Sequence, residues 1–108
     1  MSAHDKIHGQ VTSAPVMLYM KGSPAFPQCG FSSSAVQMLK ACGVDRFQSF
    51  DVLSDPEIRQ GIKEYANWPT IPQLYVNGEF VGGADIMREM YQSGELQKLL
   101  ESVKVQAG

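Results

Sequence analysis

One cysteine of the chain precedes a predicted helix in a way that can make its thiol reactive. Cys29 follows Phe26-Pro27-Gln28 and precedes Gly30-Phe31-Ser32, where apolar residues begin to recur with helical spacing. A thiol at a helix N-terminus faces unpaired backbone N–H groups and the positive end of the helix dipole, and both favour the thiolate. Ser32 stands where a C-x-x-C redox pair would carry its second cysteine. Disulfide chemistry at Cys29 therefore needs a second thiol from elsewhere.

The other cysteine, Cys42, ends the same predicted helix. A helix of that length is about 20 Å long at ~1.5 Å per residue, whereas a disulfide needs Cα atoms within about 7 Å of each other. The two cysteines therefore cannot pair within one chain, and Cys42 is expected to be a small buried core residue. The same structural role is the alternative for Cys29, but its loop of proline and glycine neighbours favours a functional thiol.

Two further segments could bind a ligand near the thiol. Lys21 closes a predicted buried strand just before the Cys29 loop, where a cation would stabilise a thiolate and could bind a carboxylate. An ordinary solvated lysine is the common alternative. The run Gly82-Gly83-Ala84-Asp85 joins a predicted strand to a helix. Its glycines let the backbone approach a ligand closely, and the free N–H groups of the helix N-terminus suit an anion. Asp85 could instead be the N-cap of that helix.

The apolar spacing and the turn residues predict the elements that must position these groups. Val16–Met20 is a continuous apolar run typical of a strand covered on both faces, and a capping box from Ser54 to Glu57 starts a helix that reaches about Tyr65. Asn77-Gly78 is a strong hairpin signal between strands over 73–76 and 79–81. The remaining predicted elements are helices over 2–13, 30–41, 85–92 and 95–103 and a strand over 47–52.

This order of elements begins with a β-α-β unit and ends with a hairpin and two helices. It predicts an α/β fold in which a four-stranded mixed sheet is flanked by helices, with an extra helix at the N-terminus. In open α/β sheets the functional site lies where a strand ends and the next helix begins. Cys29 occupies such a position.

Composition restricts the class of protein. A chain of 108 residues that is 44% hydrophobic is expected to form one domain over 1–108. A formal net charge of -2 and a pI of about 5.6 argue against nucleic-acid binding, and no apolar run approaches the roughly 20 residues that span a bilayer. Two cysteines do not make a disulfide scaffold, and residues 1–6 resemble neither a signal nor a transit peptide, so a reducing cytoplasm is expected.

Three blocks of sequence carry a resemblance to a known family. They are Cys29-Gly30-Phe31-Ser32, the run Trp-Pro-Thr-Ile-Pro-Gln over 68–73, and the run Asn-Gly-Glu-Phe-Val-Gly-Gly-Ala-Asp over 77–85. In this order and at these separations they resemble the monothiol, CGFS-type glutaredoxins of the thioredoxin-like superfamily. The resemblance extends over nearly all of residues 15–100. It implies a thioredoxin-like fold and one glutaredoxin domain with its core at about 15–103.

The resemblance also implies a site for glutathione. Lys21 and Arg59 correspond to residues that hold its carboxylates, a task that suits the guanidinium fork. Lys63, four residues after Arg59, is expected to be an ordinary surface residue. Pro72 resembles the cis-proline of this fold, which would turn the Ile71 backbone towards the thiol so that it pairs with a peptide ligand as a strand does. A tight entry into the next strand is the alternative.

At the γ-glutamyl end of glutathione, the resemblance implies contacts from the Ala84 N–H and from Asp85, which would meet the ammonium group. Many relatives carry a cysteine at the position of Ala84. Any mechanism that depends on that cysteine is closed to this chain.

Two functions then remain open, and glutathione supplies the missing thiol in both. Cys29 could ligate an iron–sulfur cluster, or it could act as the catalytic thiol of a glutathione-dependent thiol–disulfide oxidoreductase. A [2Fe–2S] cluster takes four ligands, so two chains and two glutathiones, each giving one thiolate, would complete the set. This count favours a carrier or scaffold that forms a cluster-bridged homodimer, with at most weak oxidoreductase activity. The family is also associated with BolA-like partners and with delivery to apo iron–sulfur proteins.

Overall fold

The computed structural model describes residues 2–107 and the side chains of residues 2–103. The elements follow in the order α1 (Ala3–Thr12), β1 (Val16–Met20), α2 (Gly30–Ala41), β2 (Gln48–Asp51), the short 3-10 helix η1 (Val52–Ser54), α3 (Pro56–Ala66), β3 (Gln73–Val76), β4 (Glu79–Gly82), α4 (Ala84–Ser93) and α5 (Glu95–Ala107).

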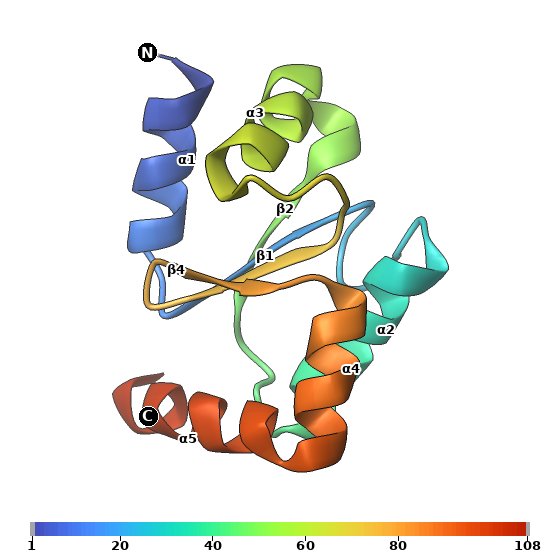
Figure 1. Cartoon of the computed structure of the whole chain (residues 1–108), viewed down its shortest axis with the longest axis vertical. Helices are drawn as coiled ribbons and strands as arrows, with labels where there is room; N and C mark the ends of the chain where they lie inside the picture. Colours follow the sequence, from blue (N-terminus) through green and yellow to red (C-terminus); the bar gives the residue numbers. More distant parts are fainter. Residues whose placement is uncertain (1, 108) are drawn as a thin grey trace.

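The four strands form one mixed sheet in the order β2-β1-β3-β4 (Figure 1). β1 pairs in parallel with β2 and antiparallel with β3, and β3 pairs antiparallel with β4. The parallel pair needs a crossover, which α2 provides, whereas the Asn77-Gly78 turn closes the β3–β4 hairpin with both residues at positive φ. The predicted α/β fold and its extra N-terminal helix are confirmed.

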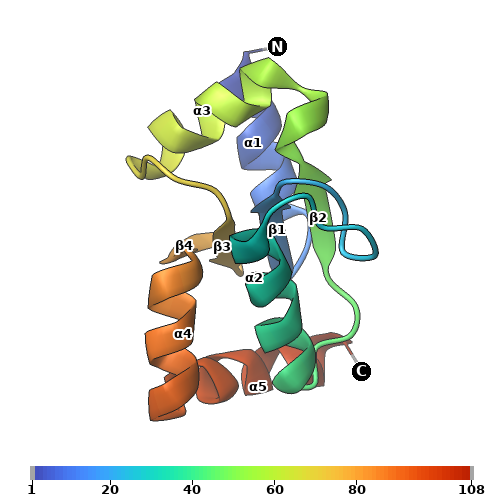
Figure 2. The same ribbon diagram turned by 90° about the vertical axis from the view of Figure 1, so that its right-hand side faces the viewer.

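Helices cover both faces of the sheet (Figures 1 and 2). All five residues of β1 are buried, as the apolar run predicted. Because side chains alternate across a strand, Val16, Leu18 and Met20 pack with α2, α4 and α5, whereas Met17 and Tyr19 pack with α1 and α3. α1 adds two fully buried residues to the second cluster, Ile7 and Val11. No helix in the described part of the chain is long and apolar enough to cross a bilayer.

The start of α3 differs from the prediction by one residue. Its N-cap is Asp55, whose Oδ1 accepts hydrogen bonds from the backbone N–H groups of Glu57 at 3.1 Å and Ile58 at 3.3 Å. Ser54 instead ends η1 and donates its hydroxyl to the carbonyl of Asp51 at 2.6 Å. Pro56 is the physical reason, because proline suits the first helical position and so places the cap at the residue just before it.

Other boundaries shift by a few residues. β2 begins at Gln48 rather than 47 and ends at Asp51, because η1 takes over at Val52. β4 continues to Gly82 beyond an irregularity in its pairing with β3, and α4 begins at Ala84. Longer than predicted, α3 ends at Ala66 and α5 at Ala107. In spite of these shifts, each predicted site residue lies on or next to the helix or strand where it was expected.

We predict that the helix cap at Asp55 contributes measurably to stability. Asp55→Ala removes the acceptor of two backbone N–H groups and should lower the free energy of unfolding by about 1 kcal/mol. Ser54→Ala is the matched control, since its exposed hydroxyl caps no helix, and should change stability by less than about 0.5 kcal/mol. Urea unfolding of both variants measures the difference. A larger loss in Ser54→Ala would return the cap to the residue predicted from the sequence.

Candidate functional site

The thiol of Cys29 lies at the N-terminus of α2. Cys29 is the N-cap residue, with extended backbone at φ −157° and ψ 142°, and its side chain is partly exposed. Partial burial opposes ionisation, but the backbone N–H groups of Ser32 and Phe31, the Ser32 hydroxyl and the charge of Lys21 outweigh it and lower the pKa of the Cys29 thiol. The helix N-terminus thus favours the thiolate form of Cys29, as the sequence predicted.

Ser32 is fully buried, and its hydroxyl joins two elements of the site. Its Oγ accepts a hydrogen bond from the backbone N–H of Lys21 at 3.0 Å. This bond connects the end of β1 to the first turn of α2 and so holds Lys21 beside the thiol. The residue that replaces a resolving cysteine therefore has a structural task of its own.

The loop between β1 and Cys29 is tightly folded. The backbone N–H of Gln28 donates to the Lys21 carbonyl at 2.8 Å, and the N–H of Gly22 donates to Asp51 Oδ1 at 2.9 Å. Gly22 has φ +88°, and a Cβ there would lie 2.5 Å from the Phe26 carbonyl oxygen. Only glycine fits this backbone, so the loop has little freedom to move the thiol away from β1.

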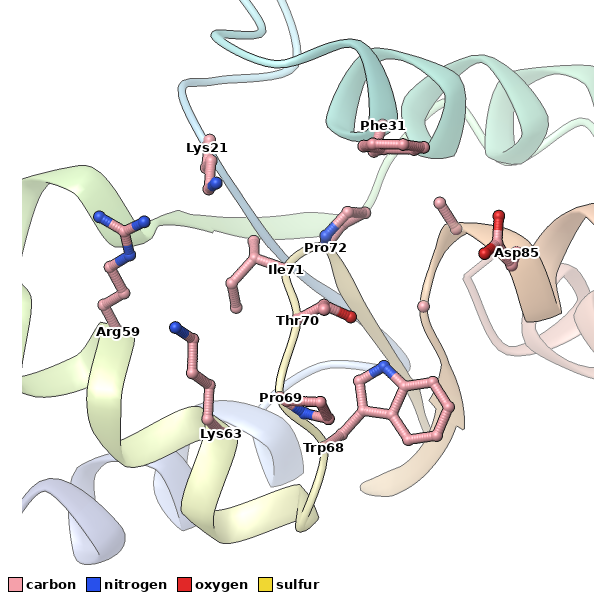
Figure 3. A pocket seen from close by; sticks show the side chains of 12 residues that line it. Lys21, Phe31, Arg59, Lys63, Trp68, Pro69, Thr70, Ile71, Pro72 and Asp85 are labelled. Atoms are coloured by element: carbon pink, nitrogen blue, oxygen red, sulfur yellow. The ribbon is translucent and has the colours of Figure 1, made fainter.

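A cleft of about 360 Å³ lies next to the first turn of α2, and Figure 3 shows the side chains that line it. Cys29 does not line it but interacts with two residues that do, Lys21 and Phe31. All five residues predicted to bind a cofactor line this one cleft, although they come from four separate segments of the chain. The full lining is Lys21, Phe31, Arg59, Lys63, Trp68, Pro69, Thr70, Ile71, Pro72, Gly83, Ala84 and Asp85.

One end of the cleft is positively charged. The side chains of Lys21, Arg59 and Lys63 reach it from the end of β1 and from α3 (Figure 3). Within the residues whose side chains are described, none of these three cations forms an ion pair. Lys63, which was expected to be an ordinary surface residue, also lines the cleft. Its spacing of four residues from Arg59 places both on one helix face and could have indicated this.

The segment between α3 and β3 forms one wall of the cleft. The Ile71–Pro72 peptide bond is cis, as predicted, and Ile71 is buried. The indole Nε1 of Trp68 is buried and has no hydrogen-bond partner within the described part of the chain. A Cβ on Gly83 would lie 3.1 Å from that nitrogen, so glycine permits the close contact of this wall with the start of α4.

The start of α4 forms the opposite end of the cleft. Gly83 is the N-cap and gives no side-chain hydrogen bond, so the first-turn N–H groups of α4 lack a side-chain acceptor. The alternative role of Asp85 as N-cap is therefore wrong. Its exposed carboxylate lies 3.8 Å from Arg88 one turn along α4, a weak surface pair. The cleft thus has cations at one end and a carboxylate with helix N–H groups at the other (Figure 3).

Cys42 lies at the opposite end of α2 from Cys29. It is the C-cap of α2, is 4% exposed and belongs to the apolar core. No disulfide joins it to Cys29. The described residues also contain no group of three or more His, Cys, Asp and Glu side chains that could hold a metal ion.

We predict that Lys21 is one cause of the acidity of Cys29. Lys21→Met should raise the pKa of the Cys29 thiol without restoring its unfolded value, because the helix N–H groups still act. Thiolate absorbance against pH, recorded in a Cys42→Ser background, measures the shift. Lys98→Met on α5 is the control. An identical titration in Lys21→Met and its parent would contradict the role of the lysine.

The same ionisation predicts a pH dependence of stability. Because the pKa of Cys29 is lower in the folded than in the unfolded chain, the thiolate stabilises the fold above the unfolded pKa. This contribution disappears as the pH falls through the folded pKa. The free energy of unfolding of the wild type minus that of Cys29→Ser should therefore rise with pH across this window, as denaturant titrations can show.

Comparison with known proteins agrees with this geometry. A family model described as glutaredoxin matches residues 16–81. The chain is 62% identical over 96 residues to an uncharacterized ycf64-like monothiol glutaredoxin of Synechocystis, covering 89% of each chain. It is 58% identical over 97 residues to glutaredoxin 4 of Escherichia coli K12, covering 90% of this chain and 84% of that one.

Solved structures give the same result. The reduced apo form of poplar GrxS14 superposes with a TM-score of 0.81 at 50% identity, covering 94% of this chain and 92% of that one. The chain belongs to the glutaredoxin family, as a monothiol glutaredoxin with a thioredoxin-like fold.

Proposed function

We propose that this protein binds glutathione in the cleft and carries a [2Fe–2S] cluster on Cys29 as its cargo. The observation that supports this most is that a single thiol with a lowered pKa lies beside a cleft whose three cations form no ion pair among the described side chains. The lowered pKa of Cys29 favours its thiolate, and no second thiol lies near it. Ser32 is buried, and its hydroxyl accepts a hydrogen bond from the Lys21 backbone N–H. A thiolate ligand of this kind requires reducing conditions, in agreement with the expected cytoplasmic location.

Glutathione fits the residues of the cleft. The cations at one end of the cleft, Lys21, Arg59 and Lys63, can neutralise one carboxylate of glutathione. At the other end, the N–H groups in the first turn of α4 can donate hydrogen bonds to the second carboxylate. The carboxylate of Asp85 beside them suits the ammonium group. The unpartnered Trp68 Nε1 adds a buried donor on the wall between them. A cleft of about 360 Å³ is within the range of small-ligand sites. Bound here, glutathione would supply its own thiol beside Cys29.

The number of ligands then determines the assembly. A [2Fe–2S] cluster needs four ligands, and the described side chains contain no preformed metal site. One Cys29 and one glutathione from each of two chains make four thiolates. The proposed holo form is therefore a homodimer joined by the cluster. Apo iron–sulfur proteins would receive the cluster from it, and a BolA-like partner would replace one of the two chains.

Glutathione-dependent disulfide reduction is the second candidate, and the lowered pKa of Cys29 favours it. The thiolate would attack a glutathione mixed disulfide, form a bond to the glutathione sulfur and release the other thiol. A second glutathione must then attack, because Cys42 lies at the other end of α2 and Ser32 has no thiol. That bimolecular step lacks the high effective concentration of a tethered thiol, so turnover should be slow.

We predict that Cys29→Ser abolishes cluster binding whereas Cys42→Ser retains it. Both proteins are reconstituted anaerobically with glutathione, and their iron and sulfide content is measured. Sedimentation should show that the wild type is monomeric without cluster and dimeric with it. Loss of cluster in Cys42→Ser alone would overturn the ligand assignment, and a stable dimer without cluster would contradict bridging by shared thiolates.

The same preparations separate carrier from enzyme. Cluster transfer to an apo-ferredoxin is compared with steady-state turnover on a small glutathione mixed disulfide. The proposal expects efficient transfer and poor turnover. Fast turnover without detectable transfer would establish the oxidoreductase instead.

We further predict that the cations of the cleft set the glutathione requirement. Replacing Lys21, Arg59 or Lys63 by Met should weaken the glutathione-loaded complex by about 1.5–3 kcal/mol each, the range for hydrogen bonds to charged groups. Cluster stability at limiting glutathione is the measurement, and Lys98→Met on α5 is the control. An unchanged glutathione dependence in all three variants would place the ligand elsewhere.

A further inference from the structure

A buried glutamine lies directly behind the wall of the cleft. Gln73 is 0% exposed and, with Ser32, is one of the two buried polar side chains in the described part of the chain. Burying a carboxamide is costly unless its donors and acceptor are satisfied. Its partners therefore indicate why a polar residue occupies the first position of β3.

The carboxamide of Gln73 is fully engaged. Its Nε2 donates to the carbonyl of Trp68 at 3.1 Å and to the carbonyl of Thr70 at 3.2 Å. Its Oε1 accepts from the hydroxyl of Tyr75 at 3.1 Å. Burial, followed by the neighbouring Tyr65, raises the pKa of Tyr75, so this hydroxyl remains a donor. Gln73 thus connects a strand of the sheet to two carbonyls of the cleft wall.

The wall has no comparable support from the backbone. The Trp68 N–H donates to the Lys63 carbonyl at 2.9 Å, but across residues 69–72 the described chain gives no hydrogen bond between backbone groups. Ile71, which lines the cleft, lies between Thr70 and the strand that starts at Gln73. The buried Ile71 side chain packs in the apolar cluster on this face of the sheet, and within the described chain the two bonds from Gln73 are the hydrogen bonds that hold the backbone on the Ile71 side of Trp68.

We propose that Gln73 is a positioning residue for the bound thiol peptide: it holds the carbonyls of Trp68 and Thr70 so that the Ile71 backbone faces the ligand. It does not line the cleft, so its effect reaches the ligand through the wall alone. This inference rests on the proposed glutathione site. It adds a residue whose loss should weaken glutathione binding while the ionisation of Cys29 is unchanged.

The side-chain chemistry explains why neighbouring residue types would not serve. Glutamate could accept from Tyr75 but, when ionised, has no hydrogen to give the two carbonyls. Asparagine is one methylene shorter, and methionine fills the space without a donor. Only glutamine offers both N–H groups and the acceptor at this reach.

The test uses an exchange reaction that needs no cluster. The Cys29 thiolate attacks oxidised glutathione, the glutathione S–S bond breaks, a bond forms between Cys29 Sγ and one glutathione, and the other glutathione leaves as a thiolate. Mass spectrometry in a glutathione redox buffer gives the equilibrium fraction of the mixed disulfide. Gln73→Met should shift this equilibrium towards the free thiol by about fivefold, the equivalent of roughly one net hydrogen bond.

Two further readouts and two further variants assign the effect to the wall. Trp68 is the only tryptophan, so stronger acrylamide quenching of its fluorescence in Gln73→Met should report a loosened segment, whereas the pKa of Cys29 should be unchanged. Tyr75→Phe keeps both bonds to the wall and should shift the equilibrium less than Gln73→Met. Gln97→Met is the matched control, because it removes a carboxamide that donates to the Tyr91 carbonyl away from the cleft.

A folded Gln73→Met with unchanged exchange equilibrium and unchanged quenching would overturn the positioning role while leaving the glutathione site intact. If this variant does not fold, hydrogen exchange in the wild-type protein tests the role of Gln73 instead. Both side-chain amide protons of Gln73 should then be protected from hydrogen exchange in the NMR spectrum, and rapid exchange would overturn the role. A wild-type equilibrium equal to that of Cys29 in the unfolded chain would remove the glutathione site itself.

Discussion

The hydrogen bond from the Lys21 N–H to Ser32 Oγ joins the end of β1 to the first turn of α2. Through this bond the thiol of Cys29, the cation of Lys21 and the free N–H groups of the helix stay within reach of one another. The cation and the helix N–H groups both favour the thiolate, so the acidity of Cys29 depends on how firmly the strand and helix are joined. The serine therefore contributes to the chemistry although it cannot form a disulfide.

The rest of the site repeats this construction. Asp51 accepts from Gly22 and Leu53 and so attaches the Cys29 loop to the end of β2, while Gln73 attaches the cis-proline wall to β3. In both cases a polar side chain at the end or start of a strand ties a neighbouring loop to the sheet. The ligand-binding groups are thus held before any ligand arrives, which lowers the ordering cost of binding.

Local sequence patterns predicted most of the fold because its strongest signals involve neighbouring residues. The apolar run Val16–Met20, the Asn77-Gly78 turn and the helical spacing after Cys29 each depend on residues within a few positions. The capping box was misplaced by one residue because Ser54 and Asp55 are both good caps. Pro56, which favours the first helical position, decides between them.

By itself, the sequence determined the reactive type of residue at Cys29, the absence of a thiol at Ser32, and the order of elements that places helix ends at one edge of the sheet. Only the tertiary structure decided that the α3 face shared by Arg59 and Lys63 turns towards the cleft and that Gln73 supports the cleft wall. The reason is physical. Packing against segments distant in sequence decides which face of α3 turns towards the cleft. The partners of Gln73 are close in sequence, but the path of the chain between α3 and β3, which no periodic pattern records, brings them to its carboxamide.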